Sequence, residues 1–172
     1  MNTNTKNGYI AYGTSVSNLS ELIEKCSPID SLARMIMGEA RGESKNGKIA
    51  CAYVVKNRQT IHRISEFGGP DYKSIVTKGN GSQFNGILSK AALKPKEVDA
   101  NAWEKCLDAA SHFSDERNPI GKCLWFNTNE LYNSIVNRNG GKYVFGGGSP
   151  VTVVEKVVIG NHTFFRVEGY NY

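Results

Sequence analysis

The chain has 172 residues, of which 40% are hydrophobic, so it suits one domain with a buried core and is too short for two comfortable domains. Its 21 Lys and Arg residues outnumber 16 Asp and Glu residues, and the resulting net charge of +5 favours anionic partners such as nucleic acid or the cell wall. The basic residues are scattered, and no aromatic-interleaved motif of an RNA- or DNA-binding module occurs. We therefore expect no nucleic-acid partner and interpret the charge as affinity for the cell envelope or as plain solubility.

The N-terminal segment shows neither a basic stretch nor an apolar run of the length that a secretory signal needs. The longest apolar run, Ile49 to Val55, is far shorter than the roughly 20 residues of a membrane-spanning helix. We expect no membrane span and synthesis in the cytoplasm. Residues 1–26 are predicted to form an N-terminal extension with a short helix, and residues 27–172 the main domain.

A helix is predicted from Ser27 onwards. Ser27 is typical of an N-cap, Pro28 of the first helical turn, and Asp30 of the acid in a capping box. Apolar residues then recur with the i, i+3, i+4, i+7, i+8 spacing of one helix face, at Ile29, Leu32, Ala33, Ile36 and Met37. This pattern indicates an amphipathic helix.

Two carboxylates, Glu39 and Glu43, stand at the end of this helix. At about 100° per residue, Glu39 falls on the edge of the apolar stripe, so its carboxyl should lie half in the core. A glycine then ends the helix and Ser44 caps a second one, which puts both acids at a helix–loop–helix corner. Partial burial raises the pKa of a carboxyl, as a general acid working near neutral pH requires. The alternative is that Glu39 pairs with Arg34 or Arg41, or caps the second helix.

The middle of the chain predicts helices separated by turns. Asp71 to Thr77 is a short helix candidate, and residues 78–82 form a flexible turn before Gln83 and Phe84. Asp99 is predicted to cap a further helix. The apolar face of that helix is typical of core, with Trp103, Cys106, Leu107, Ala110 and Phe113.

The last third of the chain predicts extended structure. In a strand over Cys123 to Asn127, Trp125 and Phe126 point to opposite sides, and either ring could stack on a sugar or pack in the core. The glycine-rich stretch 137–150 is predicted to be a mobile surface loop. Val151 to Val167 is rich in strand formers, and Gly160-Asn161 can fold it into a β-hairpin. A hairpin after a helical body predicts an α+β fold.

Four motifs occur in a characteristic order along the chain. They are GEARGE followed by G-x-I-A-x-A-x-V-V-x-N-R at Gly47 to Arg58, Q-F at Gln83 and Phe84, W-F-N at Trp125 to Asn127, and I-G-N-H-x-F-F at Ile159 to Phe165. Together they resemble the SleB-type cell wall hydrolases, named for a spore-cortex-lytic enzyme, over roughly residues 30–168. The resemblance implies a mainly helical, lysozyme-like domain with a small C-terminal β-hairpin. It also implies cleavage of peptidoglycan glycan strands between N-acetylmuramic acid and N-acetylglucosamine.

The same resemblance implies roles for individual residues. It assigns the catalytic acid to Glu39. It assigns substrate contacts to Glu43, Gln83, Phe84, Trp125, Phe126 and Asn127. In this interpretation Gln83 hydrogen-bonds an acetamido or hydroxyl group, and Phe84 packs below a sugar or in the core. His162 also matches the closing motif, and we interpret it as a hydrogen-bonded structural histidine.

The number of acids bears on the mechanism. Glycosidases with two carboxylates hold them about 5 Å apart in retaining enzymes and about 6.5–9.5 Å apart in inverting ones. Apart from Glu43, no second acid stands out near Glu39 in the sequence. Enzymes of this fold that act with one Glu can use the N-acetyl group or the 6-hydroxyl of the substrate as internal nucleophile, which leaves a 1,6-anhydro-muramoyl end. We therefore favour a lytic transglycosylase over a hydrolytic muramidase.

The cysteines and histidines support a different candidate chemistry only weakly. The four cysteines, separated by 25, 55 and 17 positions, match no zinc or disulfide spacing. Cys51 could act as a nucleophile with His112 or His162, as in cysteine peptidases and amidases of the wall. Such a cysteine normally begins a helix, where the helix dipole lowers its pKa, whereas Cys51 lies inside one. Three histidines without a metal-binding pattern predict no metal site, and no cofactor is implied.

These expectations also bear on how the enzyme would be delivered to the cell wall and on what it would bind. A wall-cutting enzyme without an export signal would act in the wall or periplasm after lysis, as a phage endolysin does, or after delivery by a secretion machine. The other possibility is that a leader or a wall-binding domain was removed. We expect a monomer that binds peptidoglycan strands, with a delivery or immunity protein as a further partner class. A catalytically inactive binding module is the remaining alternative to an enzyme.

Overall fold

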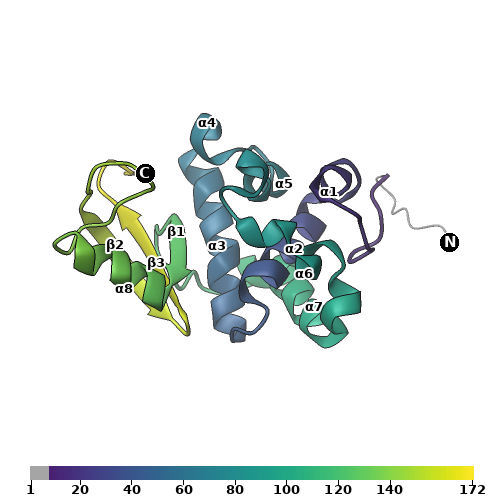
Figure 1. Ribbon diagram of the computed structural model, residues 1–172. Helices are drawn as coiled ribbons and strands as arrows, with labels where there is room; N and C mark the ends of the chain where they lie inside the picture. The colour runs from purple at the N-terminus through teal and green to yellow at the C-terminus, as the bar shows by residue number, and fades with distance from the viewer. Residues whose placement is uncertain (1–7) are drawn as a thin grey trace.

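The computed structural model describes residues 8–172, which form a helical body with a small sheet at one side (Figure 1). The helices are α1 (Leu19–Lys25), α2 (Pro28–Ala40), α3 (Lys45–Ile61), α4 (Ile64–Phe67), α5 (Tyr72–Val76), α6 (Lys90–Leu93), α7 (Pro95–His112) and α8 (Asn129–Arg138). Short 3-10 helices are η1 (Lys78–Gly81), η2 (Asn85–Leu88) and η3 (Phe113–Asp115), and the strands are β1 (Trp125–Thr128), β2 (Val153–Ile159) and β3 (His162–Val167). The prediction of a mainly helical α+β domain is confirmed.

Helix α2 runs through the centre of the helical body and contacts α5, α6, α7 and η2. Its start is as predicted, because the side chain of Ser27 accepts a hydrogen bond from the backbone of Asp30. Asp30 and Arg34, one turn apart, form a fully buried ion pair with 2.9 Å between Nε and Oδ1. The same Oδ1 accepts from the backbone N–H of Gly13, which ties the N-terminal segment to α2.

The N-terminal segment shares the core of the helical body. Ile10, Val16 and Leu22 are buried in the same cluster as the apolar face of α2. The short helix expected before residue 27 is α1, whereas residues 1–7 lie outside the described part of the chain. The division at residue 26 stays a prediction. Within residues 8–172, no helix combines the length and apolarity needed to cross a membrane.

Helix α3 lies between the helical body and the sheet (Figure 1) and is therefore buried on most of its surface. Ser44 caps it as predicted, by accepting a hydrogen bond from the backbone N–H of Gly47. The continuous apolar run from Ile49 to Val55 is buried apart from the half-buried Tyr53. The run is continuous because α3 has neighbours on both sides, with α7 and α5 on one and β1 and β2 on the other.

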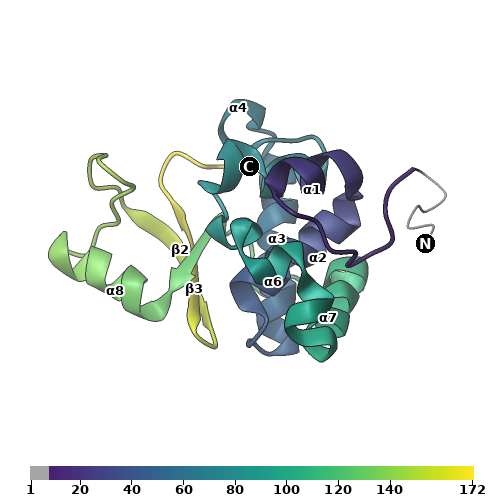
Figure 2. The same ribbon diagram turned by 45° about the vertical axis from the view of Figure 1, so that its right-hand side comes forward.

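The sheet has three antiparallel strands in the order β1-β3-β2. The predicted hairpin is confirmed as β2 and β3, joined at Gly160 and Asn161. The sequence did not predict that β1 pairs with β3, with Trp125 opposite Phe165. Nor did it predict α8, which lies beside the sheet (Figure 2). Tyr132 of α8 packs against Phe165 in a second, smaller hydrophobic cluster.

Two local predictions are refined. Asp99 caps a helix as expected, since its side chain accepts from Ala102 N–H at 3.0 Å, but one further helical turn from Pro95 precedes it in α7. The stretch 137–150 is not simply a surface loop. It begins within α8, and Tyr143 is buried and exchanges both backbone hydrogen bonds with Val151. The buried tyrosine ring attaches this glycine-rich segment to the second cluster.

The C-terminal end of α3 holds the segment that enters the sheet. Asn57 donates from Nδ2 to the carbonyls of Gly121 and Cys123, both at 2.9 Å, and Arg58 donates from Nε to the carbonyl of Leu124 at 2.8 Å. Arg58 is 2% exposed, and its guanidinium lies between the rings of Phe67 and Phe84 at 4.6 and 4.7 Å. Burial lowers the pKa of Arg58 to about 9, which leaves it cationic at neutral pH.

We expect Arg58→Lys to destabilise the protein by about 2–4 kcal/mol, because a lysine cannot fill the planar space between two rings and serve both acceptors. Urea unfolding would measure this change. The matched control is Arg117→Lys, at an exposed arginine, which should leave the free energy of unfolding within about 0.5 kcal/mol of wild type. Equal midpoints for both variants would contradict the role given to Arg58.

Candidate active site

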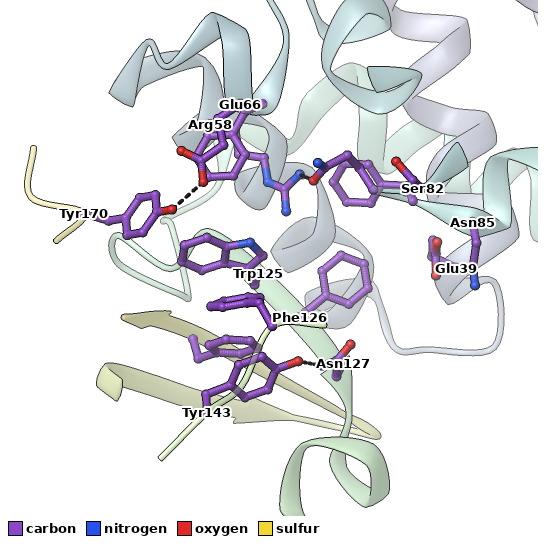
Figure 3. A pocket seen from close by; sticks show the side chains of 15 residues that line it. Glu39, Arg58, Glu66, Ser82, Asn85, Trp125, Phe126, Asn127, Tyr143 and Tyr170 are labelled. Atoms are coloured by element: carbon purple, nitrogen blue, oxygen red, sulfur yellow. Dashed lines mark hydrogen bonds between the residues drawn. The ribbon is translucent and has the colours of Figure 1, made fainter. Parts of the chain in front are cut away.

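A cleft of about 510 Å³ lies between the helical body and the sheet (Figure 3). Its polar lining residues are Glu39, Arg58, Glu66, Ser82, Gln83, Asn85 and Asn127. Its aromatic lining residues are Phe67, Phe84, Trp125, Phe126, Tyr143, Phe145, Phe165 and Tyr170. The structure thus brings Glu39 together with five of the six residues predicted to contact substrate, Glu43 being the exception.

Glu39 lies in the last turn of α2 and is half-buried, as its place on the edge of the apolar stripe predicted. Burial raises the pKa of its carboxyl, partly offset by a hydrogen bond from the N–H of Gly86 to Oε1 at 2.9 Å and by the charge of His162. Among the described residues, no cation lies within 4 Å of Glu39, and Arg34 is engaged with Asp30 instead. The alternative of a structural ion pair with Arg34 or Arg41 is therefore wrong.

A close backbone contact fixes the position of Glu39. Gly38 in α2 lies against Gly86 in η2 so tightly that a Cβ on Gly38 would come 2.1 Å from the Gly86 carbonyl oxygen. A Cβ on Gly86 would lie 2.9 Å from Cδ of Glu39 itself. Only glycine at both positions lets η2 come close enough to donate its N–H to the carboxyl.

Arg58 contacts both Gln83 and Phe84 at the cleft. The Nη1 group of Arg58 donates to Oε1 of Gln83 at 3.0 Å, so the amide nitrogen of Gln83 is the group that can donate to a bound molecule. Phe84 lines the cleft but is only 3% exposed, because the Arg58 guanidinium and Phe126 cover its ring. This geometry gives Phe84 a packing role alongside any contact with substrate.

The β1 residues form one wall of the cleft (Figure 3). Trp125 packs with the second cluster and Phe126 with the main core, so the prediction that they point to opposite sides is confirmed. Asn127 donates from Nδ2 to the hydroxyl of Tyr143. The ring of Trp125 also meets Tyr170 edge-on, with 4.7 Å between centroids.

Sequence reasoning missed one end of the cleft. Figure 3 shows Glu66 and Tyr170 at the opposite end from Glu39, where the Tyr170 hydroxyl donates to Oε1 of Glu66. Arg63 lies 4.2 Å from the Tyr170 ring and donates to the carbonyl of Gly169. The contact joins α4 to the C-terminal segment, about a hundred positions apart, so no local pattern could have predicted it.

Glu43 has a different environment from the other predicted site residues. Oε1 accepts from the backbone N–H of Asn161 at 2.9 Å, Oε2 accepts from the Asn161 side chain at 3.0 Å, and Nδ1 of His162 is 3.3 Å away. Burial would raise the pKa of Glu43, but these donors and the charges of His162 and Lys48 lower it overall. Glu43 thus holds the hairpin turn, and its substrate contact stays a prediction.

The four cysteines are buried and unpaired by disulfides. Burial raises the pKa of the Cys51 thiol well above its ordinary value, and the side chain is fully buried inside α3. A buried neutral thiol is a poor nucleophile. Within the described residues, no cluster of three His, Cys, Asp or Glu side chains could hold a metal ion.

Comparison with known proteins places the chain in a family. A family model described as Cell Wall Hydrolase matches residues 42–165, most of the chain. The chain belongs to the cell wall hydrolase family. The match confirms the resemblance drawn from the motifs and makes this protein a cell-wall-cleaving enzyme. It includes the cleft residues from Arg58 to Phe165 and begins three positions after Glu39.

A solved structure supports the fold of this cell wall hydrolase. The catalytic domain of the germination-specific lytic transglycosylase SleB from Bacillus anthracis is similar, with a TM-score of 0.51 and 20% sequence identity. The similarity covers 81% of this chain and 93% of that chain. The comparison with curated proteins gives no match.

We expect Gly86→Ala to displace the Glu39 carboxyl, because the new methyl group would overlap Gly38 and Glu39. Stability should fall by about 1–3 kcal/mol. Because Glu39 is the predicted catalytic acid, we expect the rate of wall cleavage to fall by about 100-fold, as for misplacement of a reacting group by 1 Å. Thermal unfolding and the release of soluble wall fragments would measure the two effects.

Gly147→Ala is the matched control for this variant. A Cβ on Gly147 would have no atom within 4 Å, and Gly147 is exposed away from the cleft. This variant should keep wild-type activity. If Gly86→Ala kept it too, the contact between Gly38 and Gly86 would not determine the position of Glu39.

Proposed function

We propose that this cell wall hydrolase cleaves the peptidoglycan glycan strand between N-acetylmuramic acid and N-acetylglucosamine, as a lytic transglycosylase with Glu39 as its single catalytic acid. The observation that carries the proposal is the half-buried Glu39 carboxyl in an aromatic-lined cleft, with a raised pKa and no paired cation among residues 8–172. Aromatic faces with interspersed amide groups suit sugar rings and their acetamido substituents. The similar SleB catalytic domain is that of a lytic transglycosylase, which supports the same reaction class.

The environment of Glu39 suits both halves of this reaction. As an uncharged acid it would protonate the glycosidic oxygen, and the bond from that oxygen to C1 of the muramoyl residue would break. The resulting carboxylate would then take the proton from the 6-hydroxyl of the same residue while that oxygen attacks C1. The Gly86 N–H would stabilise the carboxylate between the two steps. The second step restores the acid and leaves a 1,6-anhydro end.

The positions of the other carboxylates favour an internal nucleophile. Glu43 is engaged by the hairpin turn, through both side-chain oxygens, and Glu66 is engaged by Tyr170 at the far end of the cleft (Figure 3). Neither stands free beside Glu39 as a second catalytic carboxylate would. A cysteine-dependent peptidase is disfavoured because Cys51 is fully buried.

We expect Glu39→Gln to reduce cleavage of purified peptidoglycan by about 100- to 10,000-fold, since general acid–base catalysis contributes on this scale. Mass spectrometry of the soluble products would measure it, and 1,6-anhydro-muropeptides should come from wild type. Glu104→Gln, at an exposed glutamate on α7, is the control and should be fully active. Reducing muramoyl ends from wild type would make the protein a hydrolytic muramidase, and undiminished cleavage by Glu39→Gln would refute the assignment of the acid.

The same substitution should stabilise the protein at neutral pH. Folding raises the pKa of Glu39 above its ordinary value of 4.5, so the carboxylate opposes folding increasingly as the pH rises from 4.5 through the folded-state pKa. A glutamine keeps the acceptor for Gly86 without the charge. We expect a higher free energy of unfolding and a higher melting temperature than wild type at pH 7, and a difference that disappears below about pH 4. A loss of stability at pH 7 would contradict this account.

A further inference from the structure

The surface around Glu39 continues beyond the cleft. A second groove of about 460 Å³ lies on the other side of this residue, between the end of α2, the start of α6 and the hairpin turn. Glu39 lines both hollows, together with Asn161 and His162 in the second groove. A polymer lying in the cleft can therefore pass over Glu39 into the second groove.

The second groove leads into a third hollow, here called the corner bay. The corner bay has a volume of about 550 Å³ and is lined by residues 41–45 and Lys48 on one side, and by Asp99, Asn101, Ala102, Lys105 and Asp108 of α7 on the other. It shares Arg41, Gly42 and Glu43 with the second groove. The two walls lie side by side in Figures 1 and 2, where the start of α3 meets α7.

Charges of both signs face the corner bay without pairing with one another. Arg41, Lys105, Asp99 and Asp108 are exposed, and none of them has an ion-pair partner within 4 Å among residues 8–172. In Asp99, Oδ1 accepts the hydrogen bond from the Ala102 N–H in α7, and Oδ2 remains available to a bound molecule.

The remaining charges of the corner bay are engaged within the protein. The buried Lys48 donates to the carbonyl of Glu43, while Lys45 pairs with Glu116 at 3.2 Å in a solvent-exposed contact. The carboxylate of Glu43 is directed to Asn161. The charges available to a bound molecule are therefore two cations and two carboxylates.

We propose that the corner bay binds the stem peptide of a muramoyl residue in the part of the glycan strand that passes Glu39 into the second groove, with Arg41 and Lys105 contacting its carboxylates and Asp108 its free amine. The proposal rests on the proposed function, because the second groove links the corner bay to Glu39. The peptides attached to muramic acid carry carboxylates and, where they contain a diamino acid, an amine. A glycan without its peptides carries only the lactyl carboxylate of each muramic acid and no amine, whereas a stem peptide with a diamino acid complements charges of both signs.

The test compares two substrates, intact peptidoglycan glycan and the same glycan after an amidase has removed its peptides. Arg41→Ala/Lys105→Ala should raise KM about tenfold on the peptide-bearing glycan. On the stripped glycan, which keeps only the lactyl carboxylates at its sugar rings, KM should change less than about twofold. The matched control, Lys56→Ala/Arg138→Ala, removes one exposed lysine and one exposed arginine elsewhere on α3 and α8. It should match wild type on both substrates.

Asp108→Asn tests the amine contact separately. It should weaken cleavage of peptide-bearing glycan about fivefold and have no effect once the free amines of the peptides are acetylated. Equal effects of these substitutions on peptide-bearing and stripped glycan, or no effect on either, would overturn the proposal for the corner bay while leaving the glycan-cleaving function intact. Failure of wild type to cleave either glycan would refute the proposed function itself.

A binding measurement separates the two conclusions further. The Glu39→Gln protein should bind a soluble stem tripeptide containing a diamino acid, as followed by backbone amide shifts in residues 41–48 and 99–108. The Arg41→Ala/Lys105→Ala substitutions should abolish those shifts. Shifts confined to the aromatic cleft, or no shifts at all, would place the peptide outside the corner bay.

Discussion

Polar contacts at the two ends of α3 determine where the sheet lies relative to the helical body. At the first end, Glu43 accepts hydrogen bonds from Asn161 in the hairpin turn. At the other end, Asn57 and Arg58 donate to the carbonyls that precede β1. Apolar burial is not directional and would allow the sheet to slide along the helix, whereas hydrogen bonds require defined distances and angles. The cleft therefore keeps its width because both ends of one helix hold the sheet.

Burying Arg58 in this position has a desolvation cost that its surroundings offset. Two aromatic rings sandwich the guanidinium, and its donors meet the Leu124 carbonyl and Gln83. Interactions with ring faces and with fixed acceptors compensate a desolvated cation better than bulk packing would. The same contacts orient Gln83, so a residue that stabilises the fold also prepares the surface of the cleft.

Much of the fold could be predicted because the interactions that form these elements join residues close together in the sequence. The cap at Ser27, the apolar spacing of α2 and the hairpin turn at Gly160 each depend on a few neighbouring residues. The partial burial of Glu39 followed from the same helical spacing.

The remaining features depend on partners far along the chain. Pairing of β1 with β3 needs Trp125 opposite Phe165, the hydrogen bond to Glu39 comes from Gly86, and the far end of the cleft needs Glu66 with Tyr170. Glu43 was grouped with the substrate contacts because it shares a motif with Glu39, but its hydrogen bonds to the hairpin turn became visible only in three dimensions. A motif gives the identity of its residues and leaves their contacts open.

The two carboxylates of the corner illustrate how one short segment can hold acids of opposite character. Glu39 receives one backbone hydrogen bond in a half-buried site, and its pKa rises. Glu43, four residues later, receives two hydrogen bonds from Asn161 and faces His162 and Lys48, and its pKa falls. The number of donors thus outweighs burial at Glu43, whereas burial prevails at Glu39. Diverging pKa values in neighbouring acids are typical of a division between proton transfer and fixed charge. The surroundings of Glu43 thus favour an ionised anchor for the sheet, whereas those of Glu39 favour the protonated carboxyl more than water does.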